Sequence, residues 1–158
     1  MISDTDGGLH PKILEIFSTM DFIIHCGAIG APEVLLDLSN CSPISGVLGP
    51  NDHAEEFQPL GLELCKTFLE VPLFVRHDLG TPSKPTKDLP RILETVAPKV
   101  LLFGKTREVF NGTVDDRLWF NPGSGSPSSN GRACSIGILE IEGQSVRGEI
   151  IPLPNTLS

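Results

Sequence analysis

The stretch VLLFGKTR, residues 100–107, decides the fold prediction because an apolar run ends in polar residues. Residues 100–103 are typical of a buried strand. Side chains at the carboxyl end of a strand in an α/β sheet face a shared crevice. Three other segments end in the same way: residues 1–3 run into Asp4, residues 22–25 run into Cys26, and residues 46–48 run into Gly49. We therefore expect one cleft at the ends of four strands.

The segments between these strands predict helices in the first half of the chain and short strands in the second. Helices are predicted over 11–17 and 32–38, which begin with proline, and over 88–96, capped by Asp88. Strands are predicted over 21–25, 44–48 and 99–103, with two more between 60 and 77, and residues 81–87 predict a mobile loop. Residues 108–120 predict two short strands, and 135–141 with 145–151 predict a hairpin. This order predicts an α/β protein, a four-layer αββα sandwich of two mixed sheets flanked by helices.

Length and composition indicate one globular domain. A chain of 158 residues with 39% hydrophobic and 20% charged residues is long enough to bury a core without stabilising disulfides or metal ions. We expect a single domain over 1–152 and a loose tail over 153–158. Residues 1–3 are short for a central strand, which usually has about five residues, so the first strand is predicted to be stunted.

Charge and cysteine spacing exclude several classes of function. The formal net charge is -8, whereas binding to nucleic acid or to an anionic membrane needs a basic face. The four cysteines are scattered, which favours reduced thiols over a disulfide framework. No run has the length of a membrane span, and the first residues do not resemble a leader. We expect a cytoplasmic protein with no nucleic-acid or membrane partner.

Polar motifs at the predicted strand ends follow one another in a recognisable order. They are Asp4-Thr5-Asp6-Gly7, His25-x-Gly27, Gly49-x-x-Asp52, His77, Gly104-x-Thr106, and Asn121-Pro122-Gly123-Ser124 followed by Arg132. Over nearly the whole chain this series resembles the calcineurin-like metallophosphoesterases. The resemblance is to the small prokaryotic phosphodiesterase branch, which shares its fold with the retromer subunit Vps29. It implies the sandwich fold and a phosphoesterase ancestry.

The resemblance also implies two divalent metals held by D-x-H, G-D, G-N, a histidine before glycine, and G-H-x-H, a set that generates a hydroxide nucleophile. Most of these positions are substituted here. The substitutions are Asp6 for the D-x-H histidine, Ala28 for the bridging aspartate, Pro50 for the asparagine with Asn51 one place late, Asp78 for the glycine after His77, and Lys105 and Arg107 for the last two histidines. A methyl group cannot ligate, and permanent cations repel a metal. We expect no two-metal centre and, if any cofactor, a single Mn²⁺ or Mg²⁺ on Asp4, Asp6 and Asn51.

Each of the remaining site residues has two interpretations. Lys105 and Arg107, together with His77, can form an anion-binding pocket for phosphate or carboxylate. The alternative is that the two cations replace the metals and compensate Asp4 and Asp6 internally. Asp4 and Asp6 are then salt-bridge partners or a helix cap, in place of residual metal ligands. His77 is a candidate acid or base, or a hydrogen-bonded structural residue.

Two functions from different classes follow. The first is a degenerate family member without two-metal hydrolysis, acting as a binding or scaffold protein for a protein partner or a small phosphorylated ligand. The second is a phosphodiesterase or phosphatase that works with one divalent metal, with Lys105 and Arg107 clamping the phosphate. A homodimer through an exposed sheet edge is a further expectation.

Overall fold

The computed structural model describes residues 1–127 and 133–154. Three helices occur close to their predicted positions: α1 (Pro11–Phe17), α2 (Pro32–Ser39) and α3 (Leu89–Val96). The strands are β1 (Ile23–His25), β2 (Ile44–Gly46), β3 (Glu63–Phe68), β4 (Val71–Arg76), β5 (Gly80–Thr81), β6 (Lys84–Pro85), β7 (Val100–Leu102), β8 (Phe110–Val114), β9 (Arg117–Asn121), β10 (Ser135–Glu142) and β11 (Ser145–Pro152). The motif residue Arg132 lies outside the described residues.

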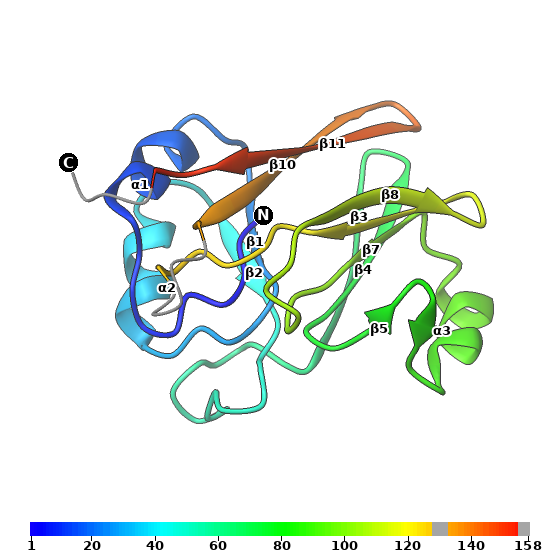
Figure 1. The fold of residues 1–158 in the computed structure, drawn as a ribbon, viewed down its shortest axis with the longest axis horizontal. Helices are drawn as coiled ribbons and strands as arrows, with labels where there is room; N and C mark the ends of the chain where they lie inside the picture. The colour runs from blue at the N-terminus through cyan, green and yellow to red at the C-terminus, as the bar shows by residue number, and fades with distance from the viewer. Residues whose placement is uncertain (128–132, 155–158) are drawn as a thin grey trace.

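Two β layers form the centre of the molecule (Figure 1). One is a five-stranded sheet in the order β3-β4-β7-β9-β8, in which β4, β7 and β9 are parallel. The other contains the parallel pair β1-β2 and the hairpin β10-β11. The first residues of the chain connect these two pairs, because Ile2 bonds to Ile24 at 3.0 Å and Met1 accepts from Gly137 at 2.9 Å.

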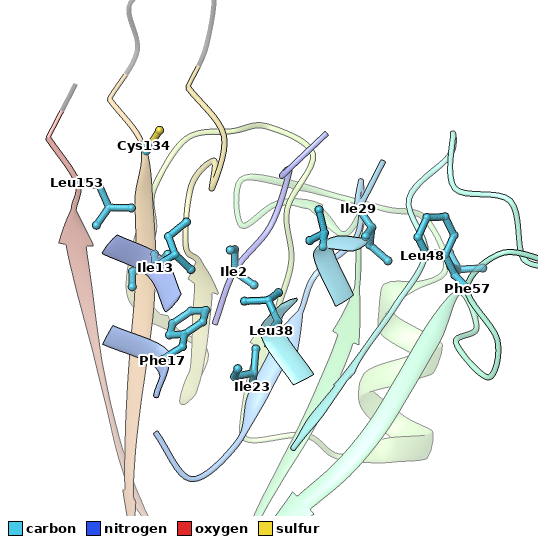
Figure 2. Packing of buried hydrophobic residues seen from close by; sticks show 12 residues of the cluster. Ile2, Ile13, Phe17, Ile23, Ile29, Leu38, Leu48, Phe57, Cys134 and Leu153 are labelled. Carbon is cyan, nitrogen blue, oxygen red and sulfur yellow. The ribbon is translucent and has the colours of Figure 1, made fainter. Parts of the chain in front are cut away.

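Three separate hydrophobic cores lie between four layers. The first core packs α1 and α2 against the β1 layer, with Phe17 and Leu38 fully buried against Ile23 (Figure 2). The second lies between the two sheets and includes Ile24, and the third packs α3 against the far side of the five-stranded sheet. Consecutive strand residues alternate between cores, as the two-residue period of a strand requires. The predicted αββα sandwich is confirmed.

Two local expectations are wrong. Residues 81–87 are not a loop throughout, because β5 and β6 pair there as a short antiparallel hairpin. Asp88 precedes α3, but its side chain does not cap the helix. Its carboxylate instead accepts two hydrogen bonds from Arg76, at 2.7 and 3.0 Å. The charge-assisted fork of an arginine offers more to a carboxylate than one backbone N–H does.

The two ends of the described chain are tied into the core. Leu153, within the segment expected to be a tail, is buried and its N–H donates to Cys134 at 2.8 Å. Residues 155–158 lie outside the described residues. None of the described helices has the length and apolar character needed to cross a bilayer.

Candidate functional site

The candidate site lies where the parallel strands of both sheets end. Asp4 and Asp6 follow the short extended segment at the start of the chain, and His77 follows β4. Lys105 and Arg107 follow β7, the central strand of the five-stranded sheet. Neighbouring strand ends are joined by backbone hydrogen bonds, from Asp4 to Gly27 at 2.9 Å and from Gly104 to His77 at 3.0 Å. Because the strands run parallel, loops distant in sequence meet at one edge.

The backbone of these loops is strongly curved. Five residues that are not glycine adopt positive φ here: Asp4 (52°), Asp6 (48°), Ala28 (56°), Lys105 (62°) and Arg107 (58°). Residues with a Cβ rarely adopt this region unless the surrounding structure imposes it. Glycine is required at position 104, since a Cβ there would lie 2.0 Å from the Ser3 hydroxyl and 3.0 Å from His77 Nδ1.

Arg107 contacts both aspartates of the first loop. Its Nη1 lies 2.6 Å from Asp6 Oδ2, and its Nε lies 3.7 Å from Asp4 Oδ1. The Asp4 side chain is only 2% exposed, and Asp4 Oδ2 accepts from the Ser3 hydroxyl at 2.6 Å. Burial raises the pKa of Asp4, while Ser3, His77 and Arg107 act to lower it. The guanidinium therefore supplies positive charge to a carboxylate that is held away from water.

His77 is buried and has a defined tautomer. Its Nδ1 lies 2.8 Å from the carbonyl oxygen of Cys26, and because a carbonyl only accepts, Nδ1 carries the proton. Its Nε2 is directed at Asp4 Oδ1, 4.0 Å away. Metal-ligating histidines commonly use this arrangement, with one nitrogen donating to a carbonyl and the other left for the ion. His77 thus keeps the orientation of a ligand.

The side chains of Lys105 and Asn51 are not part of the group formed by Arg107, Asp4 and Asp6. The Lys105 ammonium contacts Asp78, the residue after His77, rather than Asp4 or Asp6. Partial burial acts to raise the pKa of Asp78, but the bonds from Lys105 and from the Gly80 N–H outweigh it and the pKa is lowered. Asn51 lies exposed on the loop after β2. The structure brings together Asp4, Asp6, His77 and Arg107 of the predicted site residues.

Asp52 organises the neighbouring loops, a role that the sequence did not reveal. Its carboxylate accepts from the N–H groups of Ile29 and Gly30 at 3.0 Å and of Gly49 at 2.7 Å. It therefore ties the loop after β1 to the loop after β2. The signal was present in Gly49-x-x-Asp52, where an aspartate follows a tight turn.

The side chains of Asn121 and Ser124, from the last motif, form hydrogen bonds with backbone carbonyl groups. The Asn121 amide donates to the Gly104 carbonyl at 3.0 Å, and the Ser124 hydroxyl donates to the Asp4 carbonyl at 3.0 Å. These two bonds join the ends of β9 and β7 to the first loop. The side chains of this motif therefore help to fix the position of the site.

The residues at this site do not fit a two-metal centre. Ala28 offers no ligand atom, and Lys105 and Arg107 carry permanent positive charges. Within residues 1–127 and 133–154, no three His, Cys, Asp or Glu side chains are grouped closely enough to hold a metal ion. The guanidinium of Arg107 lies against the carboxylates that such an ion would need.

Comparison with known proteins places the fold among characterised families. The family model described as "Calcineurin-like phosphoesterase superfamily domain" matches residues 1–144. The chain is 25% identical over 154 residues to a probable metallophosphoesterase of Methanothermobacter thermautotrophicus, covering 95% of this chain and 86% of the relative. A structure described as a novel archaeal phosphodiesterase superposes with a TM-score of 0.72 and 23% identity, covering 95% and 97% of the two chains. The structure of Vps29 from Entamoeba histolytica complexed with Zn²⁺ superposes with a TM-score of 0.71 and 18% identity. This match covers 92% of this chain and 90% of the Vps29 chain.

These matches define the class as an αββα phosphoesterase fold of the kind shared by phosphodiesterases and Vps29. Because the matched region spans most of the chain, the protein belongs to the calcineurin-like phosphoesterase superfamily. The resemblance drawn from the strand-end motifs is confirmed.

Proposed function

We propose that this protein is a phosphoesterase-fold member that has lost two-metal hydrolysis and acts as a binding or scaffold protein. The observation that supports this most directly is the contact of Arg107 with both Asp4 and Asp6. In the family, carboxylates at these strand ends face metal ions, whereas here they face a guanidinium that cannot deprotonate near neutral pH. A hydroxide nucleophile generated by two metals has no place to form.

Anion binding at the same place is a narrower part of the proposal. Lys105, Arg107 and His77 all lie at the ends of the parallel strands, but each of the two permanent cations already contacts a carboxylate. A phosphate group would have to compete with Asp78 and Asp6 for them. We therefore propose a weak pocket for a phosphorylated ligand that displaces side-chain carboxylates, in addition to a protein partner or a second copy of the chain.

Metal analysis together with a hydrolysis assay tests the proposal. We expect purified protein to contain less than one equivalent of divalent metal, and we expect no hydrolysis of bis-p-nitrophenyl phosphate with Mn²⁺ above the rate in EDTA. The archaeal phosphodiesterase serves as the positive control for the assay. Mn²⁺-dependent turnover that disappears in the Asp4→Ala variant would show instead that this chain is an enzyme.

One observation favours the alternative, a phosphodiesterase or phosphatase that uses a single metal. His77 Nε2 faces Asp4 Oδ1 in the tautomer that metal ligands adopt, and the related Vps29 structure holds Zn²⁺. In this alternative Asp4, Asp6 and Asn51 hold the ion while Lys105 and Arg107 contact the phosphate. It requires Arg107 to leave Asp4 and Asp6, and the hydrolysis assay separates the two functions.

A further inference from the structure

We infer that Arg107 is a tethered cation that closes a latent single-ion site formed by Asp4, Asp6 and His77, so that a divalent cation and the guanidinium exclude each other. This inference rests on the proposed function, because it explains how the fold persists without the family's metals. It assigns the competition with a divalent cation to the side chain of Arg107. It also predicts a metal site that appears when this side chain is shortened.

The contacts of Arg107 define the position that a cation would take. The guanidinium touches Asp6 Oδ2 at 2.6 Å and lies 3.7 Å from Asp4 Oδ1. It thus lies against both carboxylates, and among the described residues the two aspartates and His77 are not grouped as metal ligands. The Asp6 side chain is 45% exposed, so it is able to move toward Asp4 once the guanidinium is removed.

His77 provides an independent indication that the site suits a cation. Its side chain is 7% exposed, and its Nδ1 is committed to the Cys26 carbonyl. Among the described residues its Nε2 makes no hydrogen bond and points at Asp4 Oδ1, 4.0 Å away. A buried nitrogen lone pair directed at a buried carboxylate is a donor set that Mn²⁺ or Zn²⁺ accepts.

Charge explains why the two cations exclude each other. With Arg107 in place, a divalent ion would lie a few ångströms from a permanent positive charge beside the buried Asp4 carboxylate, and like charges at that distance repel. Without Arg107, Asp4 and Asp6 would be two neighbouring anions with one of them buried, which is unfavourable without a counterion. The Arg107→Ala variant should therefore be less stable in EDTA and should gain affinity for a metal.

The test measures Mn²⁺ binding by calorimetry and thermal unfolding of the whole chain, each with and without Mn²⁺. For Arg107→Ala we expect binding at least about tenfold tighter than in the wild type. We also expect saturating Mn²⁺ to raise its unfolding temperature by about 4 °C or more. The wild type should change little. Arg107→Gln replaces the alanine variant if the latter does not fold.

Matched controls separate this effect from a general change of charge. Arg147→Ala removes an arginine that contacts one carboxylate, Glu140, on the exposed hairpin, and should leave Mn²⁺ binding at the wild-type level. Adding Asp4→Asn or His77→Ala to Arg107→Ala should abolish the gain.

Two results would overturn the inference: a folded Arg107→Ala protein that binds Mn²⁺ no better than Arg147→Ala, or a gain that survives without His77. Both leave the proposed function intact if the wild type is metal-free and inactive. A wild type that itself binds Mn²⁺ and hydrolyses phosphodiesters would contradict the proposed function instead.

Discussion

His25 should make the protein sensitive to mild acid. Its ring is fully buried at the end of β1, where Nδ1 accepts from the Gly27 N–H at 3.1 Å and Nε2 lies 2.9 Å from the Thr5 hydroxyl. Since Nδ1 is an acceptor, Nε2 carries the single proton and donates to Thr5. Burial lowers the pKa of His25 from 6.5 to about 3, with Asp52 acting in the opposite direction. The folded protein therefore holds this histidine neutral.

The sign and size of the effect follow from linkage. Between pH 6.5 and about 3 the unfolded chain binds a proton at His25 that the folded protein does not, so stability is lost as the pH falls through this range. Each unit below 6.5 costs about 1.4 kcal/mol, so the loss by pH 5 is about 2 kcal/mol. Burial dominates over the nearby charges, which are Asp52, His77, the amino terminus and Asp6.

Urea unfolding at pH 7 and pH 5 measures this loss, with His25→Gln as the comparison. Glutamine does not titrate, and the carboxylates and the amino terminus are common to both proteins, so the difference between the two pH dependences isolates His25. We expect the wild type to lose about 2 kcal/mol more than the variant. Equal losses, or a His25 ring that titrates near pH 6.5 by NMR in the folded protein, would refute the reasoning.

Two further predictions concern stability. Asp115 and Asp116 form the two-residue loop between β8 and β9, both with positive φ (49° and 60°); Asp116→Gly should stabilise the protein by up to about 1 kcal/mol in urea unfolding, and a loss of stability would contradict this. Phe17→Ala removes a fully buried ring from the first core and should cost about 3–5 kcal/mol, whereas Leu36→Ala, at a residue that is 61% exposed, should change stability by less than about 0.5 kcal/mol.

The fold could be predicted because strand and helix periods are local properties. An apolar run such as residues 100–103 predicts a strand whose side chains are buried on both faces of a sheet. Proline at the first position predicts the starts of α1 and α2. The hairpin of β5 and β6 was missed because each strand has only two residues, too few to show a period. The capping role of Asp88 was predicted incorrectly because its partner, Arg76, lies on another element and cannot be found from local sequence.

The candidate site could be predicted only as far as its charges. The order of polar strand ends placed Asp4, Asp6 and Arg107 near one another, and the structure shows these contacts. Which cation meets which carboxylate depends on side-chain reach, and the sequence did not show that Lys105 contacts Asp78. The tautomer of His77 depends on the Cys26 carbonyl, 51 residues away, so no spacing rule could have revealed it.

The backbone conformation of the site is not explained by the side chains that it carries. Asparagine and aspartate tolerate positive φ through local hydrogen bonds, but alanine, lysine and arginine do not favour it, and yet Ala28, Lys105 and Arg107 all adopt it. Their own conformational preferences cannot be the cause. The cause is the surrounding frame, in which Asp6 donates to the Ala28 carbonyl at 3.0 Å and Gly104 leaves no space for a side chain beside Ser3. Such a frame sets the loop conformations whatever side chains the loops carry, and the fold and the family match are kept. We propose that the charges of a few side chains then determine whether a metal can bind.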